Sequence, residues 1–165
     1  MQNEKKCCAE IIKKAIEKWG NKLQTVVCME ECAELIEQCI LISALDGDDK
    51  PALAEEIADV YICFEMLEMM YELDGGDILA HSALYSDNPH RGEEITSCIW
   101  RLSRLIKECS KMLRGNGNEE RLEICIADAM KCVEVLEEKY NVIAQVTEEI
   151  DCKLRRLKKR IEEEK

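Results

Sequence analysis

Two pairs of acidic residues at helical spacing are the part of this sequence best suited to chemistry. Glu31 stands three residues before Glu34, and Glu56 stands three residues before Asp59, while Glu30 directly precedes the first pair. Residues three apart project from the same face of an α-helix. Carboxylate oxygens are hard ligands that suit Mg²⁺ or Mn²⁺. The spacing therefore predicts a divalent-metal site built from these two pairs.

The segment between the pairs indicates how they meet. Residues 46–50 are short and polar and contain Gly47, and Pro51 is a residue type favoured in the first turn of a helix. Two helices joined by so short a loop pack antiparallel as a hairpin. The first pair lies about three helical turns before the loop and the second about two turns after it. We therefore expect the two pairs to face each other.

Carboxylates that converge in this way need a counter-charge. At about 4 Å, each like-charged pair costs roughly 4 kcal/mol at an effective dielectric near 20, and a few such pairs rival the stability of a whole domain. A bound divalent cation reverses the sign of that interaction. The alternative is a solvated acidic face, which is common in a chain with 35% charged residues. The E-x-x-H pairing of di-iron bundles is absent, because His81 and His90 fall in a predicted linker.

Composition sets the class of the protein. The chain has 165 residues, only 4% of them aromatic, and stretches of hydrophobic period 3.6 dominate, which predicts a single all-α domain.

The net charge of −12 argues against a nucleic-acid partner, because phosphate backbones bind basic surfaces. No run is long and apolar enough to cross a membrane, and the N-terminus is charged rather than signal-like, so we expect a cytoplasmic protein. The 11 cysteines show no C-x-x-C spacing and are interpreted as small buried hydrophobic residues.

The expected helices follow from the apolar periodicity and from helix breakers such as Trp19-Gly20 and Asp74-Gly75-Gly76. Helices are predicted over residues 4–18, 22–45, 51–73 and 142–165. We expect an N-terminal half over 1–73, a linker over 74–92 with a short helix at 77–86, and a second half over 93–141.

The second half resembles the first. When residues 28–51 are aligned with 98–121, and 53–71 with 122–140, 14 of 43 positions are identical. We interpret this as a degenerate internal duplication of the helical hairpin, giving a pseudo-dimeric four-helix core. Four of the five candidate site acids have no acidic match in the copy: Glu30, Glu31, Glu34 and Glu56 align with Trp100, Arg101, Arg104 and Cys125, while Asp59 aligns with Asp128.

The order E-E-x-x-E, some twenty residues, then E-x-x-D resembles the signature of the MazG-like all-α nucleoside triphosphate pyrophosphohydrolases. This superfamily includes the dimeric dUTPases and the dCTP pyrophosphatases. The matching sequence segments are Lys18-Trp19-Gly20, Gln24, MEECAEL and AEEIADVYICFEML, and the resemblance covers residues 10–72. Many members carry an Asn about two turns after the last Asp, where this chain has Phe64-Glu65-Met66, so the resemblance leaves nucleotide selectivity open.

The resemblance implies a Mg²⁺-dependent enzyme, with Mn²⁺ as an alternative ion. It would cleave an NTP or dNTP between the α and β phosphates. Glu31, Glu34, Glu56 and Asp59 would hold the metal, and Glu30 would orient water or a second ion. Either Glu30 or Glu34 would serve as the catalytic general base. Two alternatives remain: a dUTPase-like enzyme restricted to one pyrimidine, and a catalytically silent helical module for dimerisation or regulation.

Four further residues are candidates for substrate binding. Trp19 would stack on a base or take a place in the core, and Lys18 lies beside it. Arg101 and Arg104 replace the ligands of the first hairpin, and we expect them either to face its acidic site and grip phosphate or to lie on a solvated face. The basic run over residues 153–160 is interpreted as structural, with a phosphate contact as the alternative. The expected partner is the nucleotide, and the chain is expected to form a homodimer or remain a monomer.

Overall fold

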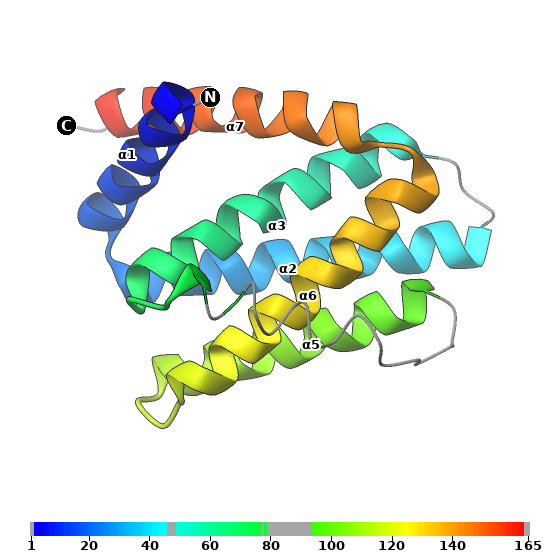
Figure 1. The fold of residues 1–165 in the computed structure, drawn as a ribbon, viewed down its shortest axis with the longest axis horizontal. Coiled ribbons are helices and arrows are strands. Elements are labelled where there is room, and N and C mark those ends of the chain that lie inside the picture. The colour runs from blue at the N-terminus through cyan, green and yellow to red at the C-terminus, as the bar shows by residue number, and fades with distance from the viewer. Residues whose placement is uncertain (1, 46–48, 77, 79–93, 164–165) are drawn as a thin grey trace.

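The structure is a computed structural model that describes residues 2–45, 49–76, 78 and 94–163, and it contains helices and no strand in those residues. This confirms the all-α class. The helices shown in Figure 1 are α1 (Gln2–Trp19), α2 (Asn21–Leu45), α3 (Lys50–Met70), α5 (Glu94–Leu113), α6 (Glu119–Tyr140) and α7 (Ile143–Glu163). Each of the described helices is too short or too polar to cross a bilayer.

Short-range signals in the sequence fix where the helices of the first hairpin start and stop. Gly20 adopts φ +82°, a left-handed conformation that favours glycine, and its N–H donates to the Ile16 carbonyl at 2.8 Å. Asp49 caps the start of α3 by accepting a hydrogen bond from the Ala52 N–H at 3.2 Å, with Pro51 in the first turn. The predicted boundaries of the first two helices therefore differ from the observed ones by one or two residues.

The end of α3 differs more from the prediction. The helix predicted over 51–73 ends at Met70, because Glu72 turns to φ +52° and the Leu73 N–H donates back to the Glu68 carbonyl at 3.0 Å. Glu72 thus takes the left-handed conformation that closes many α-helices, at a position where glycine is the more usual residue. The short helix expected over 77–86 lies outside the described residues except for Ile78, which is buried.

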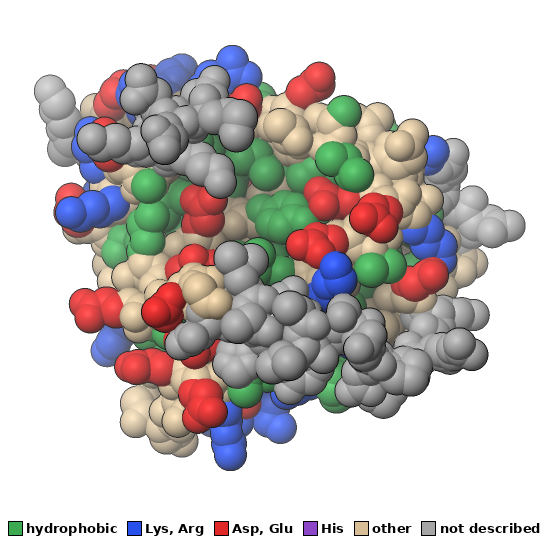
Figure 2. Space-filling view, viewed as in Figure 1, with side chains coloured by type: hydrophobic (Ala, Val, Ile, Leu, Met, Phe, Trp, Pro, Cys, Tyr) green, Lys and Arg blue, Asp and Glu red, His purple; other side chains and the backbone are tan. Residues whose placement is uncertain are grey.

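The α2–α3 hairpin is central to the packing. On one side α2 packs against α5, which in turn packs against α6, and on the other side α7 lies across α3 (Figure 1). The first helix, α1, contacts both α3 and α7. Acidic side chains are spread across the face shown in Figure 2, in keeping with the net charge of −12. The acidic pairs therefore lie on a hairpin held between two other layers of helix.

The two hairpins bury matching positions. Each of the following pairs aligns in the comparison of the two halves, and every member is at most 8% exposed: Cys28 and Cys98, Leu35 and Leu105, Cys39 and Cys109, Leu53 and Leu122, Ile57 and Ile126, Ala58 and Ala127, Cys63 and Cys132, Leu67 and Leu136. These eight repeated pairs are thus core residues in both halves. The cysteines among them are buried and unbridged, as interpreted from the sequence.

Candidate metal centre

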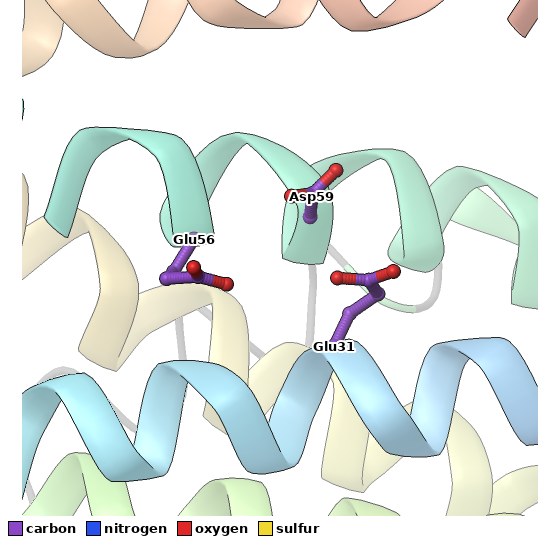
Figure 3. A group of neighbouring side chains, drawn as sticks. All are labelled: Glu31, Glu56 and Asp59. Carbon is purple, nitrogen blue, oxygen red and sulfur yellow. The ribbon is translucent and has the colours of Figure 1, made fainter. Parts of the chain in front are cut away.

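Three carboxylates come close together at the α2–α3 hairpin. Glu31 projects from α2, and Glu56 and Asp59 project from α3 (Figure 3). Each offers one carboxylate oxygen that lies within 4.8 Å of an oxygen from the other two. This confirms that the spacing of the two pairs brings acidic side chains together across the hairpin.

Packing of the two helices fixes the direction in which these side chains leave the backbone. Leu35 on α2 and Ile57 and Ala58 on α3 are completely buried, so each helix has one face fixed in the core. The register of each helix then sets the direction of its carboxylates, because neighbouring positions project at fixed angles around the axis. All three carboxylates are partly buried as a result.

Burial and mutual repulsion favour the protonated forms of these groups. Desolvation raises the pKa of Glu31 to about 7, with the negative charges of Asp59, Glu34 and Glu56 adding to the shift. The pKa of Glu56 also rises to about 7, through desolvation and then the charge of Glu34. Desolvation raises the pKa of Asp59 too, although Lys153 opposes that shift. A nearby cation would reverse these effects.

Glu56 provides a test of whether a metal ion fits. Its Oε2 atom is buried and has no hydrogen-bond partner among the described residues. A buried carboxylate oxygen without a hydrogen bond is costly, and a bound cation would satisfy it. The donor set consists of oxygens alone, which suits Mg²⁺ or Mn²⁺. Both observations fit a divalent cation held by Glu31, Glu56 and Asp59.

The other two predicted acidic site residues lie farther out. Glu34 is exposed and is not one of the three converging carboxylates, but it lines the same cleft and its charge acts on both Glu31 and Glu56. Glu30 is exposed and does not line this cleft. Of these two residues, only Glu34 therefore lies at the cleft.

The cleft beside the carboxylates has a volume of about 550 Å³. Glu31, Glu34 and Asp59 line one part of it. The facing helix, α7, contributes basic side chains to the same cleft, namely Lys153, Arg156 and Arg160. Its remaining wall is largely apolar and includes Trp19, Val27, Ile62, Met66 and Leu157. A single cleft thus combines an acidic wall, a basic helix and an apolar end.

Lys153 is the contact that the sequence interpretation missed. Its side chain is 12% exposed, and its Nζ pairs with a carboxylate oxygen of Asp59 and lies 3.3 Å from Glu55 Oε1. The first residue of the basic run thus joins α7 to one of the converging carboxylates on α3. The 3–4 spacing of the basic residues at 153, 156 and 160 was the available signal, since it places them on one helix face.

Trp19 and Lys18 occupy different places. Trp19 is half-buried and lines the cleft. The Lys18 ammonium lies 5.4 Å from the centre of the Trp19 ring and donates to the Ile161 carbonyl at 2.9 Å. Lys18 therefore joins α1 to the last turns of α7 and is not part of the cleft lining. Gln24, which had not been predicted as a site residue, lines the cleft and is 5% exposed.

Arg101 and Arg104 do not line the acidic cleft. Both pair with Asp128 inside the second hairpin: Arg101 Nη1 lies 3.0 Å from Oδ1, and Arg104 Nη1 lies 2.8 Å from Oδ2. We had expected these arginines either to face the first hairpin's site or to lie on a solvated face, and their placement matches neither. Asp128 holds them within their own hairpin, because a buried carboxylate needs a counter-charge.

The raised pKa values of Glu31 and Glu56 predict how stability depends on pH. Both folded-state pKa values, about 7, lie above the ordinary 4.5, so the folded protein binds more protons than the unfolded chain between those values. In the absence of metal, the free energy of unfolding should therefore fall as the pH rises through this window. Urea denaturation in a chelator at several pH values measures the slope. The double variant with Glu31→Gln and Glu56→Gln should have a shallower slope, and an equal slope would contradict the assignment.

Comparison with protein-family models, with curated proteins and with solved structures gave no match.

Proposed function

We propose that this protein is a Mg²⁺-dependent hydrolase that cleaves an NTP or dNTP to the monophosphate and pyrophosphate. The observation that carries the proposal is the set of three converging carboxylates, of which Glu31 and Asp59 line a cleft faced by basic side chains, while Glu56 beside them has a buried oxygen that lacks a partner among the described residues. The resemblance of residues 10–72 to the MazG-like signature supports the same assignment. An acidic wall opposite a basic helix suits a substrate whose polyphosphate is bridged by a cation.

The residues would divide the work as follows. Glu31, Glu56 and Asp59 would hold the metal, with Glu34 at the edge of the cleft. Bound Mg²⁺ would neutralise part of the triphosphate charge and lower the pKa of a bound water. Glu34 is exposed at the cleft and carries no described hydrogen bond, so its carboxylate is open to accept the proton of an attacking water.

The apolar end of the cleft suits a nucleoside. Trp19 offers a ring for stacking, and Ile62 and Leu157 line the same wall. Gln24 is buried there, and its side chain makes no hydrogen bond with the described residues. Its carboxamide can donate and accept, so it would satisfy a polar edge of a base. Clearing surplus or non-standard nucleotides in the cytoplasm is the role that fits this activity, and the preferred base is left to experiment.

We also propose that the second hairpin is a duplicated copy of the first that no longer holds a metal. The matching buried positions support a common ancestry for the two hairpins. In the copy, Arg101 and Arg104 supply fixed positive charge to Asp128, the residue that aligns with Asp59. The chain would then carry a single active hairpin in a pseudo-dimeric core.

The test is pyrophosphate release from a panel of NTPs and dNTPs that includes dUTP, with Mg²⁺. At least one nucleotide should be cleaved. The variant with Glu31→Gln and Glu34→Gln should lose about 10³-fold or more in kcat, because it removes a metal ligand and the candidate base together. The matched control is Glu37→Gln, an exposed residue of α2 outside the cleft, which should retain full activity.

The panel also separates the alternatives. Activity on dUTP alone would select the pyrimidine-specific enzyme. Folded protein that releases pyrophosphate from no nucleotide would overturn the proposal and favour a silent helical module.

A further inference from the structure

Helix α7 presents a line of cations to the cleft. Lys153, Arg156 and Arg160 follow one another at spacings of three and four residues, and all three line the cleft. In Figure 1, α7 runs across the molecule above α3, the helix that carries Glu56 and Asp59. The positive charge of α7 therefore lies opposite the acidic wall in a protein whose net charge is −12.

The three basic residues are not equivalent. Lys153 is enclosed and engaged, since its ammonium pairs with Asp59 and with Glu55. The guanidinium groups of Arg156 and Arg160 are exposed and make no hydrogen bond or ion pair with the described residues. By contrast, the guanidinium groups of Arg101 and Arg104 are both committed to Asp128. Two cations on α7 are therefore open to an anionic ligand, and a third is held by a carboxylate of the candidate metal centre.

The position of Lys153 brings it into competition with a metal ion. Asp59 is one of the three converging carboxylates, and in the structure its Oδ2 atom receives the Lys153 ammonium. A divalent cation bound by Asp59 would lie close to that ammonium, and the two like charges would repel each other. The flexible four-carbon stem of a lysine lets its ammonium move away without moving the helix.

We propose that Lys153 exchanges partners during the reaction cycle. Without metal it neutralises Asp59, and when a metal cation takes that carboxylate the ammonium moves to the phosphate tail of the nucleotide, beside Arg156 and Arg160. The exchange rests on the proposed function, because it assumes that Glu31, Glu56 and Asp59 bind a metal. Lys153 then offsets the charge of Asp59 in the metal-free site and later binds the phosphate tail of the substrate.

This exchange makes an unusual prediction about a single substitution. Removing the charge of Lys153 takes away a competitor of the metal, so metal should bind more tightly. The same change takes away a ligand of the phosphate tail, so the tail should bind more weakly. A merely structural role would weaken both, because a disturbed α7 would disturb the whole cleft. Opposite changes in the two affinities, tighter for the metal and weaker for the phosphate tail, therefore distinguish the exchange from a structural role.

The experiment compares Lys153→Met and Lys153→Gln with the wild type. Binding of Mn²⁺ alone is followed by the electron paramagnetic resonance of the free ion, in alkaline buffer so that the carboxylates are ionised. Binding of magnesium tripolyphosphate, which carries the tail without a base, is followed by calorimetry. Both variants should bind Mn²⁺ about tenfold more tightly and the tripolyphosphate roughly tenfold more weakly.

Two sets of controls define the result. Lys158→Met, on the same helix but outside the cleft, should change neither affinity. Arg156→Gln and Arg160→Gln should weaken tripolyphosphate binding and leave Mn²⁺ binding unchanged. If the wild type cleaves nucleotides and both Lys153 variants bind Mn²⁺ no more tightly than it does, the exchange is wrong and the proposed function stands. If the wild type binds no Mn²⁺, both are wrong.

Discussion

Asp128→Asn should lower the free energy of unfolding by about 3–5 kcal/mol, the cost typical of breaking a buried ion pair by removing one partner. Asp128 is 3% exposed and accepts from both Arg101 and Arg104. The Arg101 side chain is only 9% exposed, so loss of the carboxylate charge leaves a buried guanidinium without its counter-charge. Arg104, at 39%, can reach water and contributes less to the loss.

Urea denaturation at neutral pH measures this effect, and Asp151→Asn on an exposed part of α7 is the matched control. The control should change the free energy of unfolding by less than about 0.5 kcal/mol, as surface substitutions usually do. A loss below about 1 kcal/mol for Asp128→Asn would show that water reaches the pair and that Asp128 does not anchor the second hairpin.

Glu56→Gln should have the opposite effect in the metal-free protein. At a pH above about 7 the Glu56 carboxylate is charged, partly buried and surrounded by other carboxylates, as its raised pKa indicates. A neutral amide of the same shape should therefore stabilise the metal-free fold. We expect a gain of roughly 1–2 kcal/mol, since each pKa unit corresponds to about 1.4 kcal/mol and part of the shift is shared with its neighbours and screened by water.

The same substitution should abolish most of the response to metal. A ligand at 100 times its Kd stabilises the native state by about 2.7 kcal/mol, which is readily seen as a rise in Tm. Saturating Mg²⁺ should raise the Tm of the wild type and leave that of Glu56→Gln nearly unchanged. Thermal unfolding with MgCl₂ and with a chelator measures both effects in one series. Equal rises in the two proteins would place the ion elsewhere.

The sequence was sufficient for the local features of the first hairpin. Gly20, Asp49 and Pro51 mark helix ends through backbone preferences that act within a few residues, and α1, α2 and the start of α3 follow them. The convergence of Glu31 with Glu56 also followed from spacing, because one short loop fixes two helices side by side. The end of α3 was missed because Glu72 adopts a left-handed turn that a glutamate seldom takes.

Contacts between distant segments were not predictable in the same way. Lys153 lies 94 residues from Asp59 along the sequence, and no local sequence pattern indicates which helix α7 packs against. The arginines were misplaced for a related reason: alignment of the two halves showed which acidic residues were lost, but not where the replacements point. One signal was present, since Asp128 is the one match that the copy keeps among the five candidate site acids. A retained carboxylate aligned beside two gained arginines indicates charge balance inside the copy.

The Asp128 cluster has a consequence for how the molecule responds to its surroundings. Its cations are attached to the chain, so they cannot diffuse away when the composition of the solvent changes. In the first hairpin Lys153 pairs with Asp59, but Glu31 and Glu56 make no ion pair with the described residues. Local opening of α2 and α3 should therefore vary with dissolved ions, while opening of α5 and α6 should not. Hydrogen exchange of the α5–α6 hairpin can therefore serve as an internal control, in the same chain, for the ion dependence of the α2–α3 hairpin.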